Sequence, residues 1–159
     1  AEERRKQAEA ETRLAEQQKQ QAEAHRLEQA QQAQRQQQAT QERAAAGIAS
    51  ITWQEIDQVY SLQSNTSELQ KKEIWKKYKG KKVEWSGVVS EISETWGTLC
   101  LQVKMNYDTW TSDLLIRLKK SERQKAMALS KDSPVTFRGV LDDWGTIMPI
   151  TLNEGEIIK

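Results

Sequence analysis

The chain has 159 residues, with six Trp, one Cys, one His and a formal net charge of +1 at pH 7. This near-neutral balance provides no strong field of the kind that marks many nucleic-acid binders. The single cysteine excludes an internal disulfide. No apolar run approaches the roughly 18 residues that a membrane-spanning helix needs, so the sequence predicts no membrane span.

The large apolar residues are unevenly distributed along the chain. Leu14 and Leu27 are the large aliphatic residues before position 47, whereas every Trp follows it. A compact core therefore needs the later part of the chain. The sequence predicts one globular domain that follows a polar extension.

The extension, residues 1–46, is predicted to be a long polar α-helix, a coiled-coil-like stalk. Residues 2–46 lack Gly and Pro and are rich in Ala, Gln, Glu, Arg and Lys, which favour helix. Ala8, Ala15 and Ala22 form only a thin heptad line, so two interpretations stay open: a solvated spacer, and a helix that forms a homo-oligomer or packs on a partner helix. The composition is similar to that of stalks in bacterial envelope proteins.

Two short helices are predicted between the stalk and the rest of the domain. Thr52 and Glu55 have the spacing of a capping box and open a helix over 53–62. A second helix is expected over 66–78, ended by Gly80 as a C-cap. The sequence thus divides into a stalk (1–46), a linker with two short helices (47–80) and a barrel (81–159).

The remaining residues alternate between apolar and polar side chains, which is typical of strands. Strands are expected around 82–90, 99–105, 114–118, 135–141 and 148–152, with a helix over Ser121–Leu129 capped by Ser121. Gly87 falls within the long first strand, where a barrel must bend. The order β-β-β-α-β-β predicts a mainly β fold, the five-stranded OB-fold barrel.

Several motifs carry a resemblance to a known family: Tyr78-Lys79-Gly80-Lys81-Lys82-Val83, Gly87-Val88-Val89 and Val135-x-Phe137-x-Gly139. Over about residues 50–159 they resemble the tRNA_anti-like OB-fold domains of bacterial proteins, which are mostly uncharacterised. The resemblance implies the architecture. The family name reflects kinship with anticodon-binding folds and does not imply tRNA binding here.

A binding surface is expected on the outer face of strands two and three, between the loops that join strands one to two and four to five. Both loops contain Trp-Gly-Thr, at Trp96 and at Trp144. One interpretation is that Gly97 and Gly145 make the turns while each Trp covers an end of the barrel. The other is that both Trp side chains contact a ligand.

The predicted ligand- or partner-binding residues combine the loop aromatics with outward-facing polar and basic residues: Trp96, Trp144, Trp110, Gln102, Lys104, Arg117 and Lys119. Acidic residues also flank the loops, which weighs against phosphate. We therefore expect a protein or glycan partner before nucleic acid. The alternative is a single-stranded nucleic-acid-binding protein that uses the same Trp residues with Lys104 and Arg117.

Catalytic chemistry is not expected. The domain has no His, no P-loop or dinucleotide motif is present, and Cys100 has no identifiable base beside it. We predict a non-enzymatic binding or scaffold module with no catalytic residues, metal or cofactor. The chain begins Ala1-Glu2-Glu3 without Met, which suggests a bacterial periplasmic or envelope location with a tether upstream of Ala1; the alternative is cytoplasmic.

Overall fold

The computed structural model describes residues 2–106, 111–145 and 149–159, without the side chains of residues 3–12. The chain forms two units, residues 1–46 and residues 47–159. Each is described by itself.

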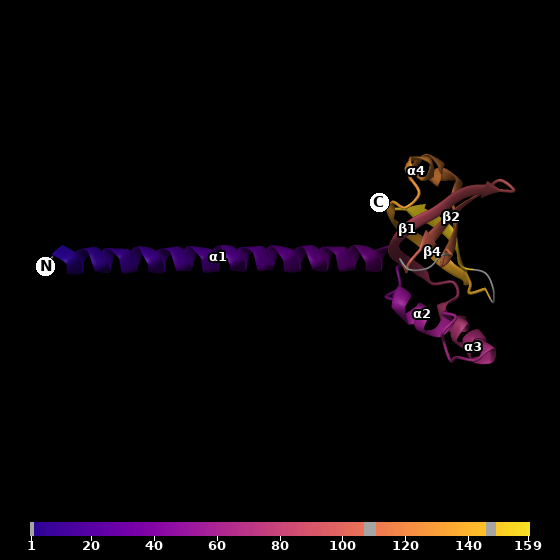
Figure 1. The fold of residues 1–159 in the computed structure, drawn as a ribbon, viewed down its shortest axis with the longest axis horizontal. Coiled ribbons are helices and arrows are strands. Elements are labelled where there is room, and N and C mark those ends of the chain that lie inside the picture. The colour runs from indigo at the N-terminus through magenta and orange to yellow at the C-terminus, as the bar shows by residue number, and fades with distance from the viewer. Residues whose placement is uncertain (1, 107–110, 146–148) are drawn as a thin grey trace. The chain divides into compact units, whose positions relative to one another are not determined.

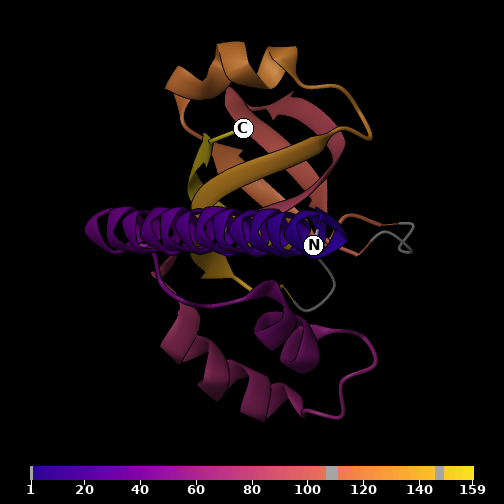
Figure 2. The ribbon, with the colours of Figure 1, turned by 90° about the vertical axis from the view of Figure 1, so that its left-hand side faces the viewer.

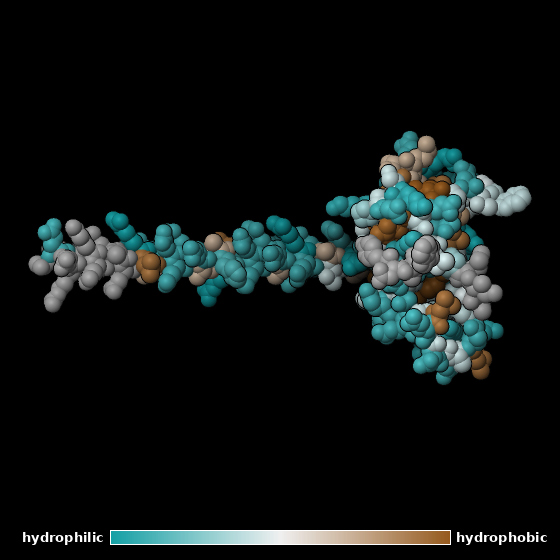
Figure 3. Space-filling view, viewed as in Figure 1, coloured by the Kyte–Doolittle hydropathy of each residue, from teal (hydrophilic) through white to brown (hydrophobic). Residues whose placement is uncertain are grey.

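Helix α1 (Glu2–Ala45) forms the first unit and confirms the predicted long helix. Its 44 residues correspond to about 65 Å at 1.5 Å per residue. Leu14 and Leu27 are each 60% exposed, and Figure 3 shows a largely hydrophilic surface over the coloured part of the helix. The side chains described in α1 are exposed, so its helicity depends on intrinsic propensity and on any partner it packs against.

Helices α2 (Trp53–Tyr60) and α3 (Glu68–Tyr78) open the second unit, and both begin with a capping box. Thr52 and Glu55 form the first, as the sequence predicted. Ser67 and Gln70 form the second. Each box satisfies backbone donors that the first helical turn leaves unpaired, which fixes where the two helices start.

Five strands close into a barrel in the order β1-β2-β3-β5-β4. The strands are β1 (Lys82–Thr95), β2 (Thr98–Lys104), β3 (Leu114–Leu118), β4 (Pro134–Asp143) and β5 (Ile150–Ile157). All neighbours are antiparallel except β3 and β5, which are parallel. This is the OB-fold architecture, and the predicted fold class is confirmed.

The core lies inside the barrel and extends under α2 and α3. The largest fully buried side chains are Phe137, Ile56, Leu101, Leu114, Ile116, Leu141, Leu152, Val83, Val89, Val103 and Val135. Gly87 of β1 lies against the end of β2. A Cβ on Gly87 would lie 2.5 Å from Val103 Cγ1 and 2.7 Å from the Lys104 carbonyl oxygen, so only glycine permits this approach.

The helix between β3 and β4 differs from its prediction. It consists of a short 3₁₀ turn, η1 (Lys120–Glu122), and α4 (Arg123–Ala128), and no side chain caps the start of either. Ser121 is therefore not the cap. Instead, the buried Glu122 carboxylate accepts a hydrogen bond from Ile157 N at 2.9 Å and pairs with Lys125 at 3.0 Å, which attaches α4 to β5.

The helices occupy opposite ends of the barrel. Figures 1 and 2 both show α4 at one end and the α2–α3 pair at the other. The indole N–H of Trp75 donates to the Asp142 carbonyl at 3.1 Å, and that of Trp85 donates to the Ile51 carbonyl at 2.9 Å. These bonds anchor α3 to β4, and the segment preceding α2 to β1.

Candidate functional site

The β1–β2 hairpin presents Trp96 to solvent. Thr95 pairs with Thr98, so Trp96 and Gly97 alone form the turn. Their φ angles are +52° and +73°, the pattern of a type I′ turn, in which Asn-Gly is strongly preferred and Trp is not. The Trp96 side chain is 96% exposed. Gly97 makes the turn as predicted, and Trp96 covers no part of the barrel.

Trp144 differs from Trp96, because it packs on the domain. Its side chain is half-buried and packs against the core, with its ring centroid 5.4 Å from that of Tyr60. Gly145 has φ +58°, as expected. Trp144 thus covers the α2 end of the barrel, as the first of the two interpretations expects, and it contributes to packing.

Trp144 belongs to an aromatic cluster that also contains Tyr60, Trp75 and Tyr78. Tyr60 and Trp75 meet edge to face with ring centroids 5.2 Å apart, and the Tyr60 hydroxyl donates to the Lys71 carbonyl at 2.8 Å. Burial, with Tyr78 nearby, raises the pKa of Tyr60 to about 12. Tyr60 is therefore neutral at physiological pH and acts as a hydrogen-bond donor.

The outer face of β2 and β3 carries Gln102 and Arg117, as predicted, together with Cys100 beside Arg117 and Leu115 beside Gln102. The Gln102 side chain donates to Glu91 at 3.3 Å and accepts from the Ser112 hydroxyl at 2.8 Å. It is thus fixed between β1 and the residues before β3. Cys100 is buried, although it lies on this face.

The two basic residues predicted from β3 are paired with groups from β4 and β5. Arg117 donates to the Asn153 side-chain oxygen at 3.1 Å and lies 3.5 Å from the Asp142 carboxylate. Lys119 donates to Glu156. This bond lowers the pKa of Glu156 and raises the pKa of Lys119. The positive charge of this face is therefore largely compensated.

Asn153 and Glu156 were missed by the sequence analysis. The parallel pairing of β3 with β5 places them beside Arg117 and Lys119, and this pairing arises when the barrel closes. No local pattern signals it. Of the other predicted site residues, Lys104 ends β2 half-buried, and Trp110 lies outside the described residues.

An ion pair lies near the tip of the exposed hairpin, two residues before Trp96. Arg123 at the start of α4 lies 2.8 Å from Glu94 of β1. The hydrogen bond from Arg123 lowers the pKa of Glu94, so the pair is charged at neutral pH. It joins the hairpin to α4.

The described part of the chain contains no group of three or more His, Cys, Asp or Glu side chains placed to hold a metal ion. None of its helices is both long enough and apolar enough to cross a membrane.

No protein-family model and no curated protein sequence matches the chain, so membership in the tRNA_anti-like family stays a prediction. Solved structures with similar folds include a Klebsiella pneumoniae subsp. pneumoniae MGH 78578 protein described as a "putative nucleic acid-binding lipoprotein" (24% identity, TM-score 0.42, 53% of this chain and 75% of that one). An OBody bound to hen egg-white lysozyme has 13% sequence identity and a TM-score of 0.41, over 52% of this chain and 80% of the OBody chain. The S. pombe Stn1–Ten1 complex has 15% sequence identity and a TM-score of 0.38, over 49% of this chain and 58% of the matched chain.

Proposed function

We propose that the OB-fold domain is a non-enzymatic binding module that contacts a partner protein through Trp96 and the outer face of β2 and β3. One observation carries this proposal: a Trp that is 96% exposed occupies a turn position with φ +52°. The backbone strain costs free energy in the isolated domain, and the exposed ring gains none of the burial that a Trp side chain can provide. Trp is among the residues most enriched at protein contact sites, where burial of the ring would offset the strain.

The compensated charge on the same face supports a protein partner before nucleic acid. Phosphate binding draws its affinity from Lys and Arg side chains that release counterions. Arg117 and Lys119 already lie against Asp142 and Glu156. A phosphate backbone would have to compete with these carboxylates, whereas a protein surface can match a mixed charge pattern.

A single-stranded nucleic-acid binder is the second candidate, favoured by the exposure of the same Trp96 ring. Bases stack on exposed aromatic rings regardless of sequence, and Lys104 and Arg117 lie on the strand face that OB-folds use for oligonucleotides. The two candidates predict opposite results when the protein is titrated with single-stranded oligo-dT.

The larger setting is proposed as well: α1 acts as a stalk, or as an assembly helix, that presents the domain in a bacterial periplasm or envelope. The tRNA_anti-like family is the finer relationship proposed for the domain. Fractionation of cells that express the full-length protein tests the location, since recovery only in the cytosolic fraction would contradict it.

The binding surface is tested with Trp96→Asn and, as a matched control, Met127→Ala, which removes a side chain that is 77% exposed on α4. A partner retained by wild type and by Met127→Ala, but lost with Trp96→Asn, supports the proposal. Equal retention by all three proteins contradicts it. Titration with oligo-dT at low and high salt, followed by Trp fluorescence, tests the second candidate: salt-sensitive quenching that Trp96→Asn abolishes would replace the first.

A further inference from the structure

A second candidate site lies at the α2 end of the barrel, away from the exposed hairpin. A cleft of about 680 Å³ lies among α2, the residues that follow it, the segments flanking the β2–β3 connection, and the end of β4 with the start of β5. This volume is within the range of small-ligand pockets, roughly 300–1,000 Å³. We call it the aromatic cleft.

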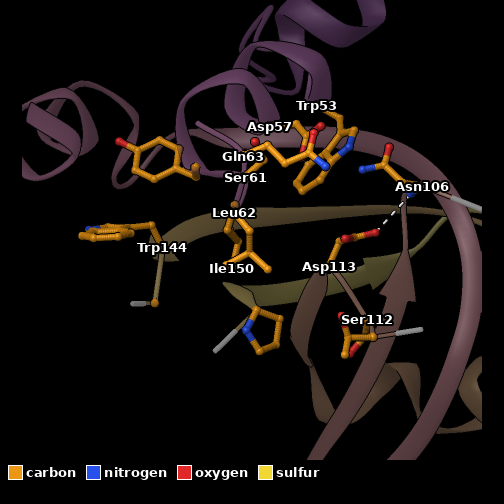
Figure 4. A pocket seen from close by; sticks show the side chains of 14 residues that line it. Trp53, Asp57, Ser61, Leu62, Gln63, Asn106, Ser112, Asp113, Trp144 and Ile150 are labelled. Atoms are coloured by element: carbon orange, nitrogen blue, oxygen red, sulfur yellow. Dashed lines mark hydrogen bonds between the residues drawn. The ribbon is translucent and has the colours of Figure 1, made fainter. Parts of the chain in front are cut away.

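Aromatic and aliphatic side chains form much of its wall. Figure 4 shows Trp53 and Trp144 on opposite sides, with Leu62 and Ile150 between them. Tyr60 adds a third ring, in contact with Trp144. Leu62 is fully exposed, which leaves a large apolar side chain in water at the cleft.

The rest of the lining is mainly polar, and its polar side chains carry carboxylate, amide and hydroxyl groups. Asp57 and Gln63 come from α2 and the residues after it, and Asn106, Ser112 and Asp113 from the barrel side. The Asp113 carboxylate accepts hydrogen bonds from the backbone amides of Met105 at 2.7 Å and Asn106 at 3.1 Å. Its orientation is therefore fixed.

Trp53 contributes an unpaired donor. It is 7% exposed, and within the described part of the chain its indole N–H is buried with no hydrogen-bond partner. The indoles of Trp75 and Trp85, buried to a similar degree, both donate to backbone carbonyls. A buried donor without an acceptor is rare in folded proteins and calls for a partner.

The charge of the cleft limits the chemistry of its ligand. The described residues that line it include two carboxylates, Asp57 and Asp113, and neither Lys nor Arg. Phosphate and carboxylate ligands are therefore disfavoured, because nothing in this lining offsets the loss of their hydration. A neutral ligand rich in hydroxyl groups matches the acceptors and amides.

The fold also disfavours an extended peptide. Peptides that add to a sheet need an unpaired strand edge, and the described strands close into a barrel. Aromatic rings instead suit the C–H faces of a pyranose, because the negative ring face attracts the electropositive hydrogens. Side-chain carboxylates and amides then bind the hydroxyl groups at its edge.

We propose that the aromatic cleft binds a short neutral oligosaccharide, with a sugar ring against Trp144 and Tyr60, hydroxyl groups bound by Asp57 and Asp113, and a sugar oxygen as acceptor for Trp53. This site is separate from the surface assigned to Trp96. The two proposals can therefore fail independently.

The test uses the full chain and a panel of neutral oligosaccharides, namely cello-, malto- and chito-oligosaccharides of two to six units, with sulfated heparin hexasaccharide as the anionic comparison. Binding is measured by saturation-transfer NMR and isothermal titration. We expect saturable binding of at least one neutral oligosaccharide and none of the sulfated one. Failure of the whole neutral panel, or preference for the sulfated sugar, would overturn the proposal.

Variants assign the binding to the cleft. Trp53→Phe keeps an aromatic ring but removes the N–H, and it should weaken binding by about tenfold or more, the value of one well-placed hydrogen bond. Asp57→Asn, at a half-buried position on α2, is the second variant and covers the case in which Trp53→Phe misfolds. Trp96→Asn is the matched control and should bind as wild type does. Unchanged affinity in both cleft variants, or loss of binding in Trp96→Asn, would contradict the proposal.

Discussion

Replacement of Trp96 by Asn should stabilise the domain while it removes the proposed contact. A non-glycine residue in the left-handed region costs roughly 1–2 kcal/mol, which Asn tolerates better than other residues. Trp96 has φ +52° and is 96% exposed, so its ring contributes almost no burial that the substitution could lose. We therefore expect Trp96→Asn to gain about 1 kcal/mol in free energy of unfolding, or about 4 °C in Tm.

Two further variants separate backbone strain from side-chain effects. Trp96→Ala removes the ring but keeps a Cβ at positive φ, so it should gain little or nothing. Glu154, also at φ +52° and exposed, provides the matched backbone, and Glu154→Asn should gain a similar amount. Urea unfolding of the four proteins measures these differences. A loss of about 1 kcal/mol or more in Trp96→Asn would refute the reasoning, because it would mean that the indole packs on the domain.

Three other predictions concern the remaining predicted features. Trp144→Ala should lower the free energy of unfolding by about 2 kcal/mol, roughly half the cost of truncating a fully buried Trp; a thermal melt identical to wild type would contradict its role in packing. The bond from Lys119 lowers the pKa of Glu156 in the folded state, so this carboxylate stabilises the fold above the usual glutamate pKa of 4.5 and ceases to do so as the pH falls through its lower folded value. Glu156→Gln should therefore flatten the acid loss of stability measured by urea midpoints, and an unchanged pH profile would show that the pair does not form. The isolated segment 1–46 should show helical circular dichroism, with sedimentation distinguishing a monomeric spacer from an assembling helix; a disordered spectrum even within the full chain would exclude both.

Local sequence signals predicted most of the fold because the features they mark are local. The Thr52–Glu55 capping box and the two turn glycines, Gly97 and Gly145, depend on residues within a few positions of each other. Strand alternation likewise depends on which side chains face the core. Ser121 was predicted to cap this helix on the same local grounds. In the structure the residue before α4 is Glu122, whose carboxylate binds the backbone of Ile157 in β5, and no side chain caps the helix.

The candidate site was less predictable because it depends on contacts between distant strands. Alternation correctly placed Gln102 and Arg117 on the outer face. It did not predict that Asn153 and Asp142 would lie beside Arg117, because their proximity requires β5 to lie between β3 and β4 in the closed barrel. The patch that appears basic in the linear sequence is thus a mixed surface in the fold.

The two Trp-Gly-Thr segments show how identical residues acquire different roles. At the first, the Thr95–Thr98 pair restricts the connection to two residues, and Trp96 projects beyond the ladder, where its side chain is 96% exposed. At the second, Trp144 packs against Tyr60 of α2, with the two ring centroids 5.4 Å apart. The packing of Trp144 thus accounts for its ring within the domain itself. Nothing comparable covers Trp96 among the described residues: its positive φ strains the backbone, and its ring stays 96% exposed. A contact from outside the domain would bury this ring, which is the physical basis for proposing a partner at Trp96.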